Sequence, residues 1–247
     1  MGVLPEATQG TRLTLGEILT ALGYVVGGLV FWLAARERKL ATNGIGRLAL
    51  IGIVAGVIGA KITELVAMGW PTQVPAAAAL DPRVGGRALL GGMIVGWVAV
   101  EIAKRVMGIR RSTGDLFALA LPAGEAIGRI GCYFNGCCYG KVCSLPWAVF
   151  QHDAWRHPTQ LYSAVSAVTI FIVLWAFRKK MAYEGQLFLV YLLLFGATRF
   201  LVELFRWQDH YIMGLSSMQW FCIDLMSIAT FRLIRNKNRP PAKLTPC

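Results

Sequence analysis

Long apolar stretches separated by short polar segments dominate the pattern of this chain. Seven of them approach the roughly 20 residues that a helix needs to cross about 30 Å of hydrocarbon. They are Leu15–Ala35, Leu48–Met68, Ala88–Ala103, Leu116–Tyr133, Gln160–Phe177, Gln186–Phe205 and Met218–Phe231. Backbone groups in lipid must be satisfied within the segment, which favours helices, and the period-2 alternation of a membrane barrel is missing. The pattern predicts an all-α polytopic membrane protein with about seven transmembrane helices.

Composition supports a membrane protein and argues against a second, soluble domain. Hydrophobic residues make up 56% of the chain and charged residues only 15%, whereas soluble domains carry about 25% charged residues. We therefore expect a single transmembrane helical domain over residues 1–235. Residues 236–247 are rich in Pro and Lys and are expected to form a basic, disordered cytoplasmic tail.

The net charge of +12 raises the possibility of a nucleic-acid partner, but the distribution of the charge indicates membrane topology instead. With seven spans, sixteen Lys and Arg residues fall in the segments on one side and six in those on the other. The positive-inside rule then places the N-terminus outside and the C-terminus in the cytoplasm. Nucleic acid is not expected as a partner.

The segment Gly128–Gly140, GRIGCYFNGCCYG, is the densest in candidate chemistry. Four glycines and two adjacent cysteines do not suit a simple spanning helix, because glycine permits positive φ and close backbone approach. We expect a broken helix or re-entrant turn here. Non-helical backbone at that depth must be covered by protein or line a watery cavity, and a cavity facing the outer leaflet suits a lipid headgroup.

Charged residues within the predicted spans form two pairs at helical spacing. Arg129 follows Glu125 by four residues, Arg199 precedes Glu203 by four, and Arg206 continues that second face outward. Intramembrane charges are costly and point to function, with structural ion pairing as the alternative. Because guanidinium groups bind phosphate bidentately and stay charged when partly desolvated, these arginines predict a phosphate-sized site.

The polar stretch Arg156–Tyr162, RHPTQLY, indicates the outer entry to the fifth span, since Pro158 suits the first position of a helix. His157 can be a base, a phosphate ligand or an interfacial residue. Tyr162 equally suits the aromatic belt at the membrane surface.

Three ordered motifs make the chain resemble the prolipoprotein diacylglyceryl transferase family. The family's G-R-x-G-N-F-x-N-G-E-x-x-G is matched by residues 128–140, and its R-H-P-S-Q-L-Y-E by residues 156–163. Its G-x-x-R-F-x-x-E-x-x-R is complete, as Gly196, Arg199, Phe200, Glu203 and Arg206.

The resemblance also has departures. Cys132 stands where the family has its signature Asn, and Cys137 where it has its signature Glu. The family's His-Gly-Gly-Leu reads Leu90-Gly91-Gly92-Met93, and the Tyr-Gly pair of the first span corresponds to Gly16-Glu17.

The resemblance implies a transferase of a bacterial inner membrane, with a site facing the periplasmic side. In the family reaction a lipoprotein cysteine thiol attacks a glycerol carbon of phosphatidylglycerol, and glycerol phosphate leaves. No cofactor is implied. The implied substrate-binding residues are Arg129, Arg199, Arg206, Asn135, Gly140, Gln160 and Tyr162, and the candidate catalytic residues are Glu203, His157, Cys137 and Cys138.

The cysteines leave two further functions open. A cysteine nucleophile suits acyl transfer through a labile thioester, so a cysteine-dependent lipid acyltransferase is one alternative. A non-enzymatic redox or metal-binding membrane protein is the other. Cys132, Cys137, Cys138 and Cys143 have no standard zinc spacing, and they can form structural disulfides, reactive thiols or a metal site.

Overall fold

The computed structural model describes residues 14–38, 40, 43–67, 89–109, 111–208 and 211–236. The chain divides into two compact units. Unit 1 comprises Met1–Gly27 and Ala118–Cys247, and unit 2 comprises Gly28–Phe117. Nearly all of the predicted tail, residues 236–247, lies outside the described residues. The predicted single domain over residues 1–235 stays a prediction.

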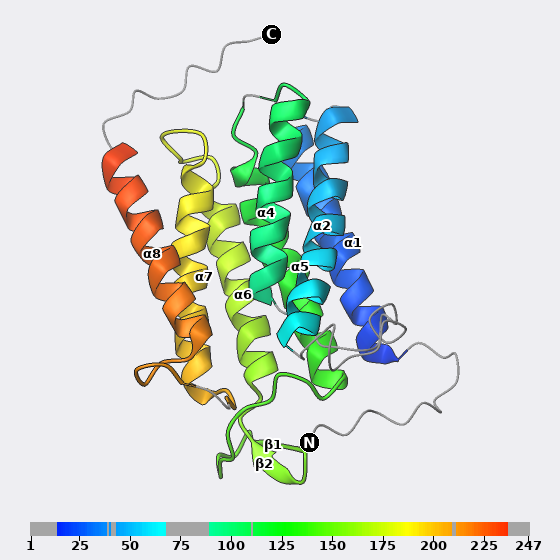
Figure 1. Ribbon diagram of the computed structural model, residues 1–247, viewed down its shortest axis with the longest axis vertical. Coiled ribbons are helices and arrows are strands. Elements are labelled where there is room, and N and C mark those ends of the chain that lie inside the picture. The colour runs from blue at the N-terminus through cyan, green and yellow to red at the C-terminus, as the bar shows by residue number, and fades with distance from the viewer. Residues whose placement is uncertain are drawn as a thin grey trace. The chain divides into compact units, whose positions relative to one another are not determined.

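Helices account for most of the described residues, as the apolar pattern predicts (Figure 1). Within the described part of the chain, four segments are long and apolar enough to span a membrane, namely Leu15–Glu37, Gly44–Val66, Thr159–Phe177 and Gln186–Phe205. The described helices are α1 (Leu15–Glu37), α2 (Asn43–Ala67), α4 (Leu89–Val106), α5 (Gly114–Phe134), α6 (Thr159–Phe177), α7 (Gln186–Phe205) and α8 (Ser217–Asn236).

Glycines in unit 2 let α2 and α4 pack with their backbones close together. A Cβ on Gly92 would lie 2.9 Å from the carbonyl oxygen of Gly56, and one on Gly96 would lie 3.2 Å from that of Gly52. Small residues at this spacing are typical of close helix packing in membranes. The glycines in these helices therefore have a packing role.

Unit 1 contains a short β-hairpin that the sequence did not predict. A hairpin of β1 (Val149–Gln151) and β2 (Ala154–Arg156) pairs Val149 with Arg156 in antiparallel register. It lies at the same end of the unit as the C-terminal end of α5, the start of α6 and the C-terminal end of α7 (Figure 1). The all-α prediction therefore holds for the helical part of the unit but omits two short strands.

The expected break in Gly128–Gly140 is wrong for its first half. Helix α5 continues without interruption to Phe134. Gly131 is needed for close packing instead, because a Cβ there would lie 2.7 Å from the carbonyl oxygen of Gly16 in α1. The irregular backbone begins only at Asn135. The glycines of the motif thus serve two purposes, helix packing before the break and turn geometry after it.

Candidate functional site

The end of α5 is a tight turn that brings three thiols together. The Cys137 N–H bonds the Cys132 carbonyl at 3.2 Å, and Gly136 takes a φ of +65°. This left-handed closure is a common way to end a helix, because it satisfies its last carbonyls. Cys138 follows with a φ of +61°, so the chain turns twice within three residues.

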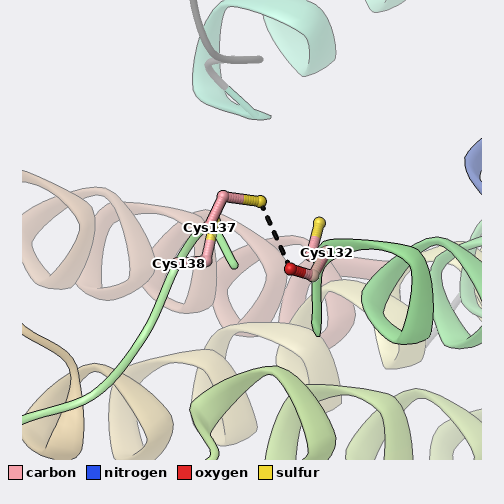
Figure 2. Close-up of side chains that lie close together, drawn as sticks. All are labelled: Cys132, Cys137 and Cys138. Atoms are coloured by element: carbon pink, nitrogen blue, oxygen red, sulfur yellow. Dashed lines mark hydrogen bonds between the residues drawn. The ribbon is translucent and has the colours of Figure 1, made fainter. Parts of the chain in front are cut away.

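The thiols of Cys132, Cys137 and Cys138 lie within 4.8 Å of one another. Figure 2 shows Cys137 turned toward Cys132, with its sulfur 3.6 Å from the Cys132 carbonyl oxygen. Cys143 does not belong to this group, because it pairs with Trp155 through a backbone bond of 2.9 Å. Of the four cysteines considered for a metal site, the structure thus brings three together.

All described cysteines are free thiols, so the structure does not support a stapling disulfide. Hydrogen bonds from the Cys132 and Cys137 thiols, reinforced by the charges of Arg206 and Arg129, lower the pKa of the Cys138 thiol well below its usual value. The pKa of Cys137 is raised, because its proton is shared with Cys132 and Cys138. The cluster thus favours one thiolate, at Cys138.

The first residues of α6 hold this turn in place through two side-chain hydrogen bonds. Thr159 donates its hydroxyl to the Cys138 carbonyl at 2.7 Å, and the amide of Gln160 donates to the Cys137 carbonyl at 2.8 Å. Both side chains are buried. Gln160, predicted as a substrate-binding residue, here fixes the position of the cysteines.

Gly140 joins the turn to the end of α7. Its N–H bonds the His157 carbonyl at 3.1 Å, and it forms an antiparallel bridge with Arg206. A Cβ on Gly140 would lie 2.9 Å from the carbonyl oxygen of Phe205 and would collide with His157. Only glycine fits between these two backbones.

The predicted helical pairing of arginines and glutamates is confirmed. Two nitrogens of Arg129 bond one oxygen of Glu125, at 3.0 and 3.1 Å. Arg199 and Glu203 are buried and form an ion pair of 2.7 Å, and Arg206 approaches the same carboxylate oxygen at 3.9 Å.

The three arginines share one electrostatic neighbourhood. Arg129 and Arg206 both act on Arg199, and both also act on the Cys138 thiol. Glu125, Glu203 and the Cys138 thiolate together balance the three positive charges. The cluster still favours an anionic ligand, because guanidinium groups offer several N–H donors to a phosphate.

A narrow cavity lies beside Arg199. Its interior is about 10 Å³, roughly the room for one water molecule. The Nε of Arg199 has no hydrogen-bond partner among the described residues, although the side chain is buried. The cavity is lined by Glu125, Ser163, Ser166, Ala167, Ile170, Phe195, Thr198, Arg199 and Val202.

His157 lies apart from the ion pairs. Its Nδ1 is 3.3 Å from the hydroxyl of Tyr162, and its ring packs against Phe205 with centroids 5.0 Å apart. Trp147 donates to the same hydroxyl at 2.8 Å. The structure thus groups His157 with Tyr162. Gly140 lies between His157 and Arg206, since it bonds the His157 carbonyl and pairs with Arg206.

Asn135 also lies apart, since its side-chain oxygen accepts a bond of 3.2 Å from Thr14. Two partners of Glu203 were missed by the sequence analysis: the Gln208 amide and the Ser216 hydroxyl both bond its Oε1. Neither residue lies at helical spacing from Glu203, so the sequence pattern does not predict these contacts. The sequence analysis also missed Ser163 and Thr198, which line the cavity. A single hydroxyl residue in an apolar helix does not form a recognisable motif.

Comparison with known proteins adds independent information. The family description of prolipoprotein diacylglyceryl transferase matches residues 16–235. A phosphatidylglycerol-prolipoprotein diacylglyceryl transferase of Clostridioides difficile is 34% identical over 80% of this chain and 79% of its own length. Proteins of the same name from Methylibium petroleiphilum and Dehalococcoides mccartyi are 30% and 28% identical, covering 83% and 91% of this chain and 86% and 90% of their own lengths.

Proposed function

Because the chain belongs to the prolipoprotein diacylglyceryl transferase family and is a transferase, we propose that its substrates are those named for its relatives. The lipid donor is a phosphatidylglycerol-like phospholipid, and the acceptor is a cysteine thiol of a lipoprotein precursor. The resemblance expected from the sequence motifs is confirmed over most of the chain. The cysteine replacements do not remove the chain from the family.

The buried Arg199 guanidinium is the observation that best supports this proposal. It lines a cavity, and its Nε lacks a partner among the described residues. A phosphodiester carries one negative charge and accepts several hydrogen bonds, which suits a guanidinium that still has an unpartnered N–H. Since the cavity holds about one water molecule, a headgroup must push its wall residues apart on entering.

The arginines suit the leaving group of the reaction. The thiol sulfur bonds a glycerol carbon, the bond from that carbon to the phosphate oxygen breaks, and glycerol phosphate leaves with one additional negative charge. Arg199, Arg206 and Arg129 stabilise that charge where it develops, in a site from which water is largely excluded. Glu203 acts as a positioning residue that orients Arg199 and Arg206.

His157 is the proposed acceptor of the thiol proton. The carboxylate of Glu203 is already held by Arg199, Gln208 and Ser216, which makes it a poor base. Among the described contacts, the Nε2 of His157 has no partner, while its Nδ1 is held by Tyr162. An imidazole is the side chain that most often serves as a general base.

A cysteine-dependent acyltransferase is the second candidate. The lowered pKa of Cys138 favours it, because thiolates are the nucleophilic form of cysteine. Alkyl transfer through this thiol is excluded chemically, since a thioether on the enzyme would not leave again.

We further propose seven membrane crossings with the N-terminus outside and a site on the periplasmic side of a bacterial inner membrane. The charge asymmetry of the loops supports this orientation. The hairpin and the thiol turn would then face outward.

Mass spectrometry of a lipobox peptide incubated with phosphatidylglycerol and the purified protein tests the function. We expect a diacylglyceryl adduct that resists hydroxylamine, together with release of glycerol phosphate. A peptide whose cysteine is replaced by serine is the control and should stay unmodified. A hydroxylamine-sensitive acyl adduct would favour the second candidate, and an unmodified cysteine peptide would refute both.

A further inference from the structure

Three cysteine thiols lie close together in unit 1. The proposed alkyl transfer does not require a cluster of thiols on the enzyme. Cys132 belongs to the last turn of α5, and Cys137 and Cys138 follow in the turn. Their sulfurs lie within 4.8 Å of one another. Three thiolates around one metal ion at about 2.3 Å would lie about 4 Å apart. Small side-chain rotations therefore bring all three sulfurs to bonding distance.

The backbone holds this arrangement without a metal ion. Gly136 and Cys138 both have left-handed φ values, +65° and +61°. A non-glycine residue rarely adopts this conformation unless its surroundings impose it. Here the imposed contacts come from α6, whose Thr159 and Gln160 bond the carbonyls of Cys138 and Cys137 at 2.7 and 2.8 Å. The site is thus preformed by contacts that involve no sulfur atom.

The donor set selects the kind of ion. Thiolates prefer soft metals, among which Cu(I) and Zn(II) are common. Structural Zn(II) sites take four protein ligands, but no His, Asp or Glu joins the three thiols among the described residues. Cu(I) accepts three thiolates alone.

The charge around the cluster points the same way. Three thiolates and one Cu(I) ion carry a net charge of −2. The positive charges of Arg129 and Arg206 both favour the Cys138 thiolate, and they would stabilise an anionic complex there in addition to their ion pairs with Glu125 and Glu203.

We propose that Cys132, Cys137 and Cys138 form a three-thiolate binding site for Cu(I) at the C-terminal end of α5. On binding, each thiol releases its proton to solvent and the copper keeps its oxidation state, so no electron is transferred. The site is separate from the cavity beside Arg199, because none of the three cysteines lines that cavity.

Titration of the purified full-length protein with Cu(I), supplied anaerobically as its acetonitrile complex, tests the site. A chromophoric Cu(I) chelator competes for the metal and reports the affinity. We expect one ion per chain. Cys132→Ser and Cys138→Ser should each weaken binding more than about a hundredfold, since even changes to groups around metal ligands cost about 10–100-fold. Cys143→Ser and Cys222→Ser are the matched controls and should retain full affinity.

A second measurement on the unaltered protein avoids variants that fail to fold. Mass spectrometry follows alkylation, at alkaline pH where the Cys137 thiol ionises, of Cys137, which is exposed, and of Cys143. One equivalent of Cu(I) should protect Cys137 and leave Cys143 reactive. Equal protection of both thiols, no protection of Cys137, or binding unchanged in Cys132→Ser and Cys138→Ser would overturn the proposal.

Discussion

Glu203 holds Arg199 by an ion pair in which Oε2 lies 2.7 Å from Nη2, and both side chains are almost completely excluded from solvent. The same oxygen lies 3.9 Å from Arg206, at the end of the helix. One carboxylate therefore orients two cations, one inside α7 and one at its C-cap. This arrangement presents a pair of guanidinium groups without leaving either of them unopposed.

Replacing the carboxylate by an amide should destabilise the protein. Glu203→Gln leaves Arg199 as a buried cation without its counter-charge, and breaking a buried pair from one side costs about 3–5 kcal/mol. The thermal unfolding midpoint in detergent should fall accordingly. Asp153→Asn, at an exposed position in the hairpin, is the control and should unfold as the unaltered protein does. Equal midpoints for the two variants would show that the pair contributes little.

For transfer activity, the bidentate geometry of the Arg199 guanidinium should matter more than its charge. Arg199→Lys keeps the charge but loses bidentate geometry, and losing one such contact to a developing anion costs about 2–4 kcal/mol in the transition state. The rate of transfer to a lipobox peptide should fall by a factor of about 30 to 1,000. Arg235→Lys, an exposed position in the last turn of α8, should retain full activity. An active Arg199→Lys enzyme would remove Arg199 from the site.

The two neighbouring thiols should react at different pH. The pKa of Cys138 is lowered by its hydrogen bonds from Cys132 and Cys137, so its thiolate forms at lower pH, whereas the raised pKa of Cys137 keeps that thiol protonated to higher pH. Modification by a small neutral thiosulfonate, followed by mass spectrometry, should thus reach half its maximal rate at lower pH for Cys138. Arg206→Gln should move the Cys138 profile to higher pH, because a stabilising cation is lost. Identical profiles for the two thiols would contradict this assignment.

Gly140 should tolerate no side chain. Gly140→Ala places a Cβ against the backbone of His157 and 2.9 Å from the carbonyl oxygen of Phe205, so the joint between the turn and α7 must open. We expect lower thermal stability and reduced transfer activity, because the joint positions Arg206. Gly46→Ala is the matched control, since nothing lies within 4 Å of the added Cβ and alanine favours helix. A harmless Gly140→Ala change would mean that the joint is free to relax.

The proposed orientation predicts which cysteines a membrane-impermeant thiol reagent reaches in intact cells. Cys137 is exposed in the turn and should be labelled once the outer membrane, where present, is permeabilised. Cys247, which lies outside the described residues, should be labelled only after the inner membrane is disrupted. Labelling of Cys247 in intact cells would reverse the proposed topology.

The sequence by itself determined the features that depend on local periodicity. The span predicted over Gln186–Phe205 coincides with α7, and the predictions for α5 and α6 differ from the structure by one or two residues at their ends. The pairs Glu125–Arg129 and Arg199–Glu203 also followed from helical spacing. Such features are predictable because residues four apart share a helix face whatever the rest of the chain does.

Only the tertiary structure decided which segments meet. Gly140 forms a bridge with Arg206, and Gln160 donates a hydrogen bond to the Cys137 carbonyl. Both contacts join residues that are far apart in the sequence. The fold also decides that Cys143 lies outside the thiol cluster. Spacing also suggested that the helix breaks at the first glycines of its motif, whereas packing against α1 explains Gly131 and lets α5 continue. A glycine in a sequence signals either a turn or a close approach, and the neighbouring backbone decides which of these it serves.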